Sequence, residues 1–218
     1  ESTGIGGDCF AIYAPGGAED GIVAFNGSGR APAGADPDWY VENGIEKIEQ
    51  HTPHAVTVPG AVDAWQRLIE DHGTKDLGEL LQPAIRFARE GYPLTSRVAS
   101  DWAGCIATLS HDPATREVFL QADGKPLPEG KVHRQEKLAA TMEKIAAHGR
   151  DAFYTGDVAD DLVSKLQSLG GHHTAADFKA ARGDYVMPVT TDYRGRTVYE
   201  CPPNGQGIIA LEMLKRSG

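Results

Sequence analysis

Several kinds of residue and segment that mark particular protein classes are scarce in this sequence. The 218 residues include only three cysteines, Cys9, Cys105 and Cys201, which are widely spaced and form no CxxC pair. This spacing indicates neither a zinc site nor a disulfide framework, and the burial habit of cysteine predicts three buried free thiols. Every apolar run is shorter than the roughly 18 to 20 residues that a membrane helix needs, so the sequence predicts no bilayer span.

Positive charge is also in short supply. The chain has 21 Lys and Arg against 31 Asp and Glu, a formal net charge of −10, and the basic residues are scattered. This balance argues against nucleic acid or an anionic membrane surface as the partner. With 40% hydrophobic and 24% charged residues, the composition is that of a soluble globular fold, and its length can bury a core as one domain.

Glycine is plentiful near the start of the chain, where we place the candidate site. Gly4, Gly6 and Gly7 precede an apolar run, but no third glycine completes the GxGxxG nucleotide pattern and a strand follows instead of a helix. The apolar segments 9–13 and 22–25 flank a Pro-Gly-Gly turn signal and predict a β-hairpin.

Arg30 is the candidate binding residue of this region. The small residues of the segment Asn26-Gly27-Ser28-Gly29 place it at a strand end, directly before Ala-Pro. A guanidinium in such a loop can make a two-pronged hydrogen bond to a carboxylate, which lysine cannot reproduce. An isolated loop arginine is also commonly a solvated or salt-bridged surface residue, and the spacing alone leaves both interpretations open.

The remainder of the chain predicts mostly helices. Trp65 is expected in the core, and Pro83 is expected to break one helical pattern and begin a second helix. Residues 110–132 are expected to be irregular with a short strand at 118–120, and 189–192 to pair with 196–200 as a hairpin. Helices are expected at residues 61–72, 77–90 with the break, 94–109, 135–148, 155–169 and from Thr174, where Asp177 supplies a near capping box.

The adjacent histidines His172 and His173 invite a metal interpretation. Neighbouring side chains point in different directions on most backbones, and no Cys or carboxylate stands at a helical i+4 or strand i+2 position. We therefore predict no metal site.

Seven segments together resemble the gamma-glutamyltranspeptidase family. They begin with GIGGDCFAIY and FNGSGRAP and continue in the family's order over nearly all 218 residues. The others are HTPHAVTVPGAVDAW, LLQPAIRFAREGYPL, GRDAFYTGDVADDLV, GGHHTAADFKAARGDYVMPV and YRGRTVYECPPNGQG.

The resemblance implies an α+β fold, the αββα sandwich of N-terminal-nucleophile hydrolases. Residues 1–218 would be a single partial domain, a portion of the large subunit, with the true N-terminus and the nucleophile-bearing small subunit absent. Because the chain starts at Glu1 without a methionine, we expect any signal peptide to be missing as well. The compartment stays open: periplasmic or secreted with a signal peptide, otherwise cytoplasmic.

The resemblance also implies a chemistry. A precursor would cut itself and free a Thr whose hydroxyl attacks a gamma-glutamyl amide of the glutathione type, with no metal or organic cofactor. That Thr is not in this chain, so we expect no catalytic residue here and no activity from the 218 residues alone. The expected partners are a gamma-glutamyl small molecule and the small subunit of the same precursor.

Arg30 is the residue carried over from the family as the clamp on the α-carboxylate of the glutamyl group. The family's arginine commonly stands three residues before Ala-Pro, next to the strand phenylalanine, so alignment on Phe25 makes Asn26 the alternative. This departure keeps open an acylase of the same fold with another acyl specificity, and a catalytically inert homologue. The loop Pro202–Gly207, which carries Asn204 where the family has small residues, is expected either to pack between subunits or to contact substrate.

Overall fold

The computed structural model describes residues 4–17 and 21–217, which divide into two compact units. Unit 1 combines the residues up to Asp76 with those from Gly149 onward, and unit 2 consists of Leu77–His148. Helices and strands are mixed in both, as expected of an α+β fold. The assignment of the whole chain to one partial domain stays a prediction.

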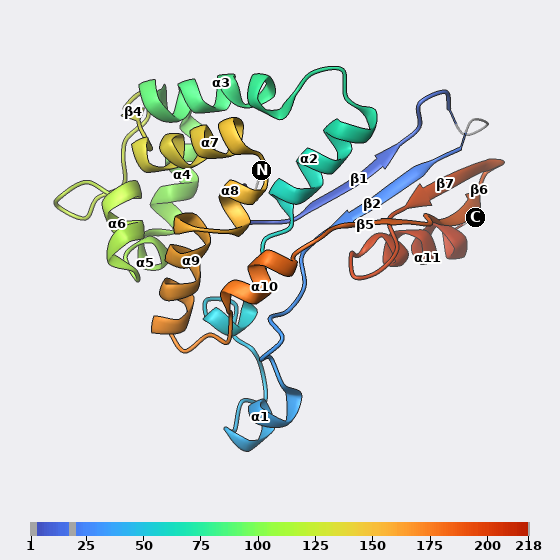
Figure 1. Cartoon of the computed structure of the whole chain (residues 1–218), viewed down its shortest axis with the longest axis horizontal. Coiled ribbons are helices and arrows are strands. Elements are labelled where there is room, and N and C mark those ends of the chain that lie inside the picture. The colour runs from blue at the N-terminus through green and yellow to red at the C-terminus, as the bar shows by residue number, and fades with distance from the viewer. Residues whose placement is uncertain (1–3, 18–20, 218) are drawn as a thin grey trace. The chain divides into compact units, whose positions relative to one another are not determined.

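A three-stranded antiparallel sheet lies at the centre of unit 1 (Figure 1). Its order is β1 (Cys9–Tyr13), β2 (Val23–Gly27) and β5 (Asp184–Val186), which confirms the predicted hairpin. Phe25 of β2 is fully buried, and α2 (Ala61–His72) packs against β1 and β2. The sheet therefore holds the end of β2 against the first turn of α2.

Three further helices of unit 1 pack against one another at one end of this sheet (Figure 1). α8 (Asp151–Tyr154), α9 (Asp157–Ser168) and α10 (Ala175–Ala180) pack together and bury Phe153, Tyr154 and Phe178. Thr174 and Asp177 form the complete capping box of α10, as predicted. The stretch between β2 and α2 carries α1 (Pro37–Glu42) and a single 3-10 turn, η2 (Pro53–Ala55).

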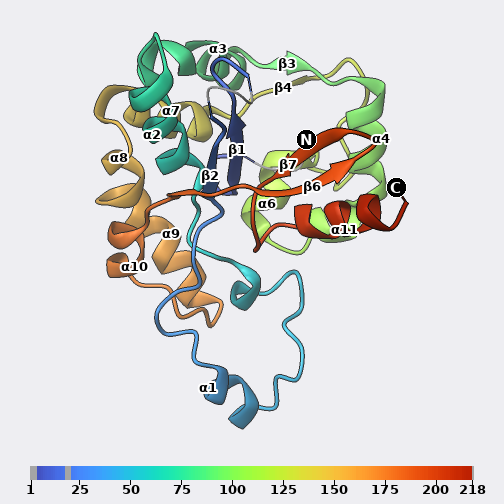
Figure 2. The ribbon, with the colours of Figure 1, turned by 90° about the vertical axis from the view of Figure 1, so that its right-hand side faces the viewer.

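A second hairpin ends unit 1. It consists of β6 (Val189–Tyr193) and β7 (Arg196–Glu200), as the alternation predicts, and α11 (Gly207–Ser217) lies along it (Figure 2). Cys201, just after β7, is buried, and its thiol lies 3.6 Å from the carbonyl oxygen of Ala11. The loop 202–206 between β7 and α11 is thereby held beside the β1–β2 hairpin.

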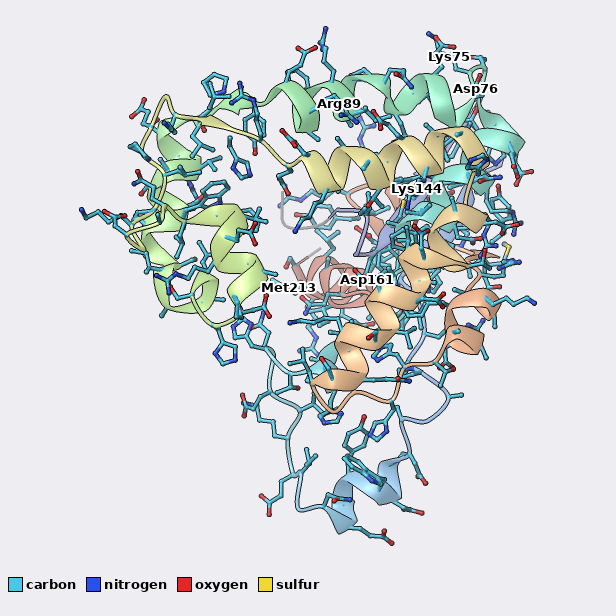
Figure 3. All side chains as sticks on the ribbon, turned by 60° about the vertical axis from the view of Figure 1, so that its left-hand side comes forward. Lys75, Asp76, Arg89, Lys144, Asp161 and Met213 are labelled. Atoms are coloured by element: carbon cyan, nitrogen blue, oxygen red, sulfur yellow. The ribbon has the colours of Figure 1, made fainter. Side chains whose placement is uncertain are left out.

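Unit 2 is built on the pair of helices α3 (Leu77–Glu90) and α7 (Glu136–His148). Leu81 and Ile85 of α3 and Met142 of α7 are buried. Figure 3 shows Arg89 on α3 beside α7, and its Nη2 lies 2.6 Å from Oε1 of Glu143. The other elements are α4 (Ser96–Gly104), α5 (Ile106–Leu109), α6 (Pro113–Phe119) and a small sheet of β3 (Tyr92–Pro93) with β4 (Val132–His133).

Three sequence predictions in unit 2 are wrong. The single helix expected over 94–109 is divided into α4 and α5 at Cys105, whose φ of −110° and ψ of 15° depart from helical geometry. Pro83 does not break α3, because it lies on the exposed side while Leu81 and Ile85 are buried, which offsets the lost hydrogen bond. Residues 118–120 do not form a strand. The Asp112 side chain accepts the backbone N–H of Thr115 and begins α6, which includes residues 118 and 119.

Two predictions about burial also need correction. Trp65 is only half-buried and does not belong to the core, although α2 forms as expected. The three cysteines are free, but Cys105 is exposed and Cys9 is half-buried, so only Cys201 fits the prediction. Among the helices that the structure describes, none has the length and apolar character needed to cross a membrane.

Candidate functional site

A pocket of about 200 Å³ lies in unit 1 where β2 ends. Both sequence candidates, Arg30 and Asn26, line it together with Ser28 and Gly29 of the same segment. The remaining lining residues come from two further segments: Arg182 and Asp184 from one, and Asn204 from the other. The end of β2, the start of β5 and the loop before α11 thus meet at one place.

Close backbone approach explains why β2 ends at this point. Gly29 has a φ of 81°, and an added Cβ would overlap the carbonyl oxygen of Val58. The Val58 N–H donates to the carbonyl oxygen of Arg30 at 2.9 Å, which aligns the two segments without a regular ladder. Glycine at position 29 is the residue type that permits both features, so the Arg30 side chain projects at the rim of the pocket.

The Arg30 guanidinium is paired with a carboxylate of the same chain. Its Nη2 lies 2.8 Å from Oδ2 of Asp184, and the two side chains are 78% and 58% exposed. Exposed pairs of this kind contribute about 0 to 1 kcal/mol, so a ligand carboxylate loses little by competing for Arg30. The guanidinium is held at the pocket and remains open to solvent.

Asn26 takes part in a side-chain network instead. Its Nδ2 donates to Oδ1 of Asn204 at 3.0 Å, and its Oδ1 accepts the backbone N–H of Ser28 at 3.1 Å. Nδ2 of Asn204 in turn donates to the Ser28 hydroxyl at 3.0 Å. The loop 202–206 therefore closes the pocket through contacts within this chain, which places Asn204 where a ligand would meet it.

Positive charge exceeds negative charge among the lining residues. Arg30 and Arg182 face one carboxylate, that of Asp184. Within the described ranges, Arg182 donates only to the carbonyl oxygens of Lys179 and Ala181 and pairs with no carboxylate. Two guanidiniums, two neutral amides and one carboxylate suit a ligand that carries a carboxylate group.

Nothing in the pocket is equipped as a nucleophile. Ser28 is buried, and the described partners of its hydroxyl are Asn204 and the carbonyl oxygen of Gly29. Neither can take the hydroxyl proton as a general base. The described side chains of the pocket are hydrogen-bond donors and acceptors, and the expectation that this chain holds no catalytic residue stays a prediction.

The two adjacent histidines lie in packing environments. His172 packs its ring on Trp39, with centroids 4.4 Å apart, and Nε2 of His173 donates to the carbonyl oxygen of Val56 at 2.8 Å. Burial lowers the pKa of His173 from its ordinary value, which keeps the ring neutral. In the parts of the chain that the structure describes, no group of three or more His, Cys, Asp and Glu residues is placed to hold a metal ion.

Sequence reasoning missed Arg182 and Asp184. They meet Arg30 because β5 pairs with β2, with Asp184 directly opposite Asn26 in the register. The only local signal was that charged residues flank Gly183 just before a predicted strand, and this is too common to identify a site.

A family model described as "Gamma-glutamyltranspeptidase" matches residues 1–216. The glutathione hydrolase-like YwrD proenzyme of Bacillus subtilis is 36% identical over 97% of this chain and 40% of its own length. A glutathione hydrolase proenzyme of the same species is 34% identical over 98% of this chain and 37% of its own length. The oxamate amidohydrolase proenzyme of Klebsiella pneumoniae is 33% identical over 97% of this chain and 40% of its own length. The chain spans about two fifths of the length of these relatives.

Solved structures give the same result for the fold. The cephalosporin acylase of Bacillus halodurans superposes with a TM-score of 0.88 at 35% identity, over 97% of this chain and 40% of that one. The gamma-glutamyltranspeptidase of Helicobacter pylori superposes with a TM-score of 0.86 at 26% identity, over 94% and 59%. The expected N-terminal-nucleophile hydrolase fold is confirmed by these likenesses.

Proposed function

Since this chain belongs to the gamma-glutamyltranspeptidase family, we propose that the whole protein is a gamma-glutamyl hydrolase or transferase that acts on glutathione-like amides. Residues 1–218 are part of the large subunit and of a single domain completed by the small subunit of the same precursor. The matches to proenzymes support a precursor that is cut into two chains.

The chemistry of the proposal needs a Thr freed by self-cleavage outside the 218 residues. Its hydroxyl oxygen attacks the gamma-carbonyl carbon, its α-amino group accepts the hydroxyl proton, and the amine leaves with a proton. The glutamyl ester that results passes its acyl group to water or to an acceptor amine. No metal or organic cofactor takes part, and the 218 residues alone are inactive.

The task of this chain is to hold the glutamyl group. The observation that carries the proposal is the pocket at the end of β2, where the exposed guanidiniums of Arg30 and Arg182 outnumber the carboxylate of Asp184. Arg30 binds the α-carboxylate of the glutamyl group, because a guanidinium offers two parallel N–H donors to it. Asn26 and Asn204 supply neutral donors beside it.

A second candidate is an acylase of the same fold with a different acid in its pocket. Asn26, and not an arginine, follows the strand phenylalanine, and it is already engaged with Asn204. The likeness to a cephalosporin acylase and to an oxamate amidohydrolase supports this alternative. A third candidate, an inert homologue, predicts that no self-cleavage occurs.

The deciding experiment begins with the intact mass of the purified full-length protein. We expect two chains, with Thr as the first residue of the smaller one, and its replacement by Ala to leave a single uncut chain. The processed protein is then given gamma-glutamyl p-nitroanilide and, in parallel, glutaryl and oxamyl amides. Cleavage of the gamma-glutamyl amide alone supports the first candidate, and preference for another amide supports the acylase. An uncut, inactive chain overturns both.

A further inference from the structure

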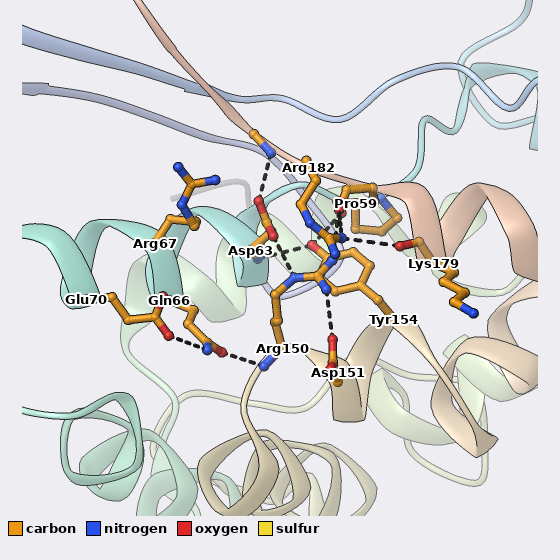
Figure 4. A network of polar contacts seen from close by, with 12 residues as sticks. Pro59, Asp63, Gln66, Arg67, Glu70, Arg150, Asp151, Tyr154, Lys179 and Arg182 are labelled. Carbon is orange, nitrogen blue, oxygen red and sulfur yellow. Dashed lines mark hydrogen bonds and ion pairs between the residues drawn. The ribbon is translucent and has the colours of Figure 1, made fainter.

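A buried carboxylate stands directly behind the pocket. Asp63, in the first turn of α2, has no exposed surface, and each of its oxygens accepts a hydrogen bond (Figure 4). Oδ1 accepts from Nε of Arg150 at 2.6 Å, and Oδ2 accepts from the backbone N–H of Gly183 at 2.7 Å. The carboxylate thus ties α2 to the segment that leads into β5.

Arg150 fixes the same segment a second time. Its side chain is only 12% exposed, and its Nη2 donates to the carbonyl oxygen of Ala181 at 2.8 Å while Nη1 reaches Asp151 at 2.8 Å. Its backbone N–H also donates to Gln66 of α2. One guanidinium therefore joins α2, α8 and the segment before β5, which a single-point cation cannot do.

Tyr154 completes the buried network. Its hydroxyl donates to the carbonyl oxygen of Pro59 at 2.7 Å and accepts the backbone N–H of Asp63 at 3.2 Å. Burial is the main cause that raises the pKa of Tyr154 to about 12, so the phenol keeps its proton. The Arg150 guanidinium lies 4.6 Å from the centre of its ring. The Asp63–Arg150 ion pair is therefore enclosed, and its hydrogen bonds hold both side chains in one geometry.

The anchored segment carries the charged wall of the pocket. Ala181 and Gly183, the two anchored residues, alternate with Arg182 and Asp184, the two charged lining residues. A Cβ at Gly183 would overlap the ring of Phe25, so this backbone has no room to slide along β2. The positions of Arg182 and Asp184 relative to Arg30 follow from where Asp63 and Arg150 hold the backbone.

We propose that Asp63 and Arg150 are positioning residues for the substrate pocket, acting through the backbone of Ala181 and Gly183 on the charged side chains that face Arg30. The inference rests on the proposed function in that the ligand of the pocket is a carboxylate-bearing acyl group. Neither residue lines the polar pocket at Asn26 and Asn204, although Asp63 lines a neighbouring cavity together with Arg30 and Arg182. Their proposed effect on binding in the polar pocket therefore runs through the backbone.

The test uses the full-length processed protein with gamma-glutamyl p-nitroanilide as probe. Arg150→Lys keeps the charge beside Asp63 but cannot reach Asp63 and Ala181 together. The double variant Asp63→Asn/Arg150→Met removes both charges, so that no buried charge is left unpaired. We expect either variant to raise KM roughly five- to tenfold with kcat changed less than about twofold, the mark of lost ground-state positioning.

A control variant at a more exposed ion pair shows whether an Arg→Lys change by itself alters KM. Arg89→Lys alters the Arg89–Glu143 pair of α3 and α7, which lines no part of the pocket, and should leave KM unchanged. In an Arg30→Met background, Arg150→Lys should add little to KM, because both changes act on the same pocket. A KM that stays at the wild-type value in both folded test variants overturns the proposal, as does a full additive effect in the Arg30→Met background.

A crystal structure of the Arg150→Lys protein tests the positioning without any substrate. We expect the 181–184 backbone to shift and the 2.8 Å contact between Arg30 and Asp184 to lengthen. An unmoved segment overturns the positioning role. If the wild-type protein cleaves no gamma-glutamyl amide, the proposed function fails, and this structural readout still decides whether Asp63 and Arg150 set the pocket's geometry.

Discussion

The side-chain amide of Asn26 donates to Oδ1 of Asn204 at 3.0 Å, across 178 residues of sequence. This contact joins the end of β2 to the loop before α11 and brings a residue from near the end of the chain into the pocket. Ser28 shares the same partner, so Asn204 serves two residues of one loop.

Replacing Asn204 by Ala should therefore weaken substrate binding. The change leaves Asn26 and the buried Ser28 without their shared partner, a loss of about 1 to 3 kcal/mol at the pocket. We expect KM for the gamma-glutamyl amide to rise by roughly five- to 150-fold in the processed protein. Gln206→Ala, in the same loop but outside the pocket, is the matched control and should leave KM as it is. Equal effects of the two changes would show that the loop merely packs.

The clamp assigned to Arg30 predicts a loss that depends on the substrate. Arg30→Met should cost about 2 to 5 kcal/mol in kcat/KM for a gamma-glutamyl anilide. The same variant should be unaffected with a 4-aminobutanoyl anilide, which lacks the α-carboxylate. Arg97→Met, which breaks an exposed pair with Asp101 outside the pocket, controls for loss of surface charge.

Asn26→Ala distinguishes the alternative alignment in the same assay. If Asn26 is the clamp on the α-carboxylate, its replacement will reduce kcat/KM for the gamma-glutamyl anilide more than Arg30→Met does and will leave the 4-aminobutanoyl anilide unaffected. A negligible loss on Arg30→Met would end the clamp assignment.

The stability of unit 2 should fall in mild acid because of His133. Its ring is 3% exposed and packs on Trp102 and Phe119, and burial lowers its pKa from the ordinary value of 6.5. Below pH 6.5 His133 is protonated in the unfolded chain but stays neutral in the folded protein until a lower pH is reached. The free energy of unfolding therefore decreases as pH falls. The limiting slope for one proton is about 1.4 kcal/mol per pH unit.

Urea unfolding of the full-length protein between pH 7.5 and pH 5 measures this slope. His133→Phe keeps the ring packing and removes the proton site, so its slope should be smaller than that of the wild type by up to the value for one proton. An identical slope in the two proteins would contradict the assignment to His133.

The three thiols should differ in reactivity. Cys105 is exposed, whereas Cys201 is buried, and burial is the main cause that raises the pKa of both Cys9 and Cys201. The thiolate is the reactive form, so iodoacetamide at pH 7.5 should modify Cys105 first. Peptide mass spectrometry after a short exposure measures the order, and faster labelling of Cys201 would show that this region opens in solution.

The sequence correctly predicted those helices and strands that are determined by residues close together in the chain, such as turn and cap residues. The β1–β2 hairpin followed from alternating apolar residues around a Pro-Gly-Gly turn, and the capping box at Thr174 predicted the start of α10. The break predicted at Pro83 is wrong because burial of residues on the other side of α3 stabilises the helix by more than the missing backbone hydrogen bond costs. The sequence did not predict α6, because the surrounding Gly and Pro favour irregular structure and the Asp112 cap is a single-residue signal.

The residues of the candidate site show the same difference between local and long-range signals. Arg30 and Asn26 were found because their strand-end loop is a continuous segment of sequence. Arg182 and Asp184 were not, because they reach Arg30 only when β5 pairs with β2. Asp63 and Arg150 stand 87 positions apart, and helix periodicity at Asp63 gives no hint that its carboxylate is buried and paired.

The order of the strands has a consequence for biosynthesis. β2 lies between β1 and β5, yet Asp184 at the start of β5 is made 154 residues after Arg30. At about 5 to 20 residues per second, a ribosome needs roughly 8 to 30 s to add them. Throughout that interval the nascent hairpin keeps one edge of β2 open to other strands. Slow codons within that stretch lengthen this interval and should lower the yield of folded protein.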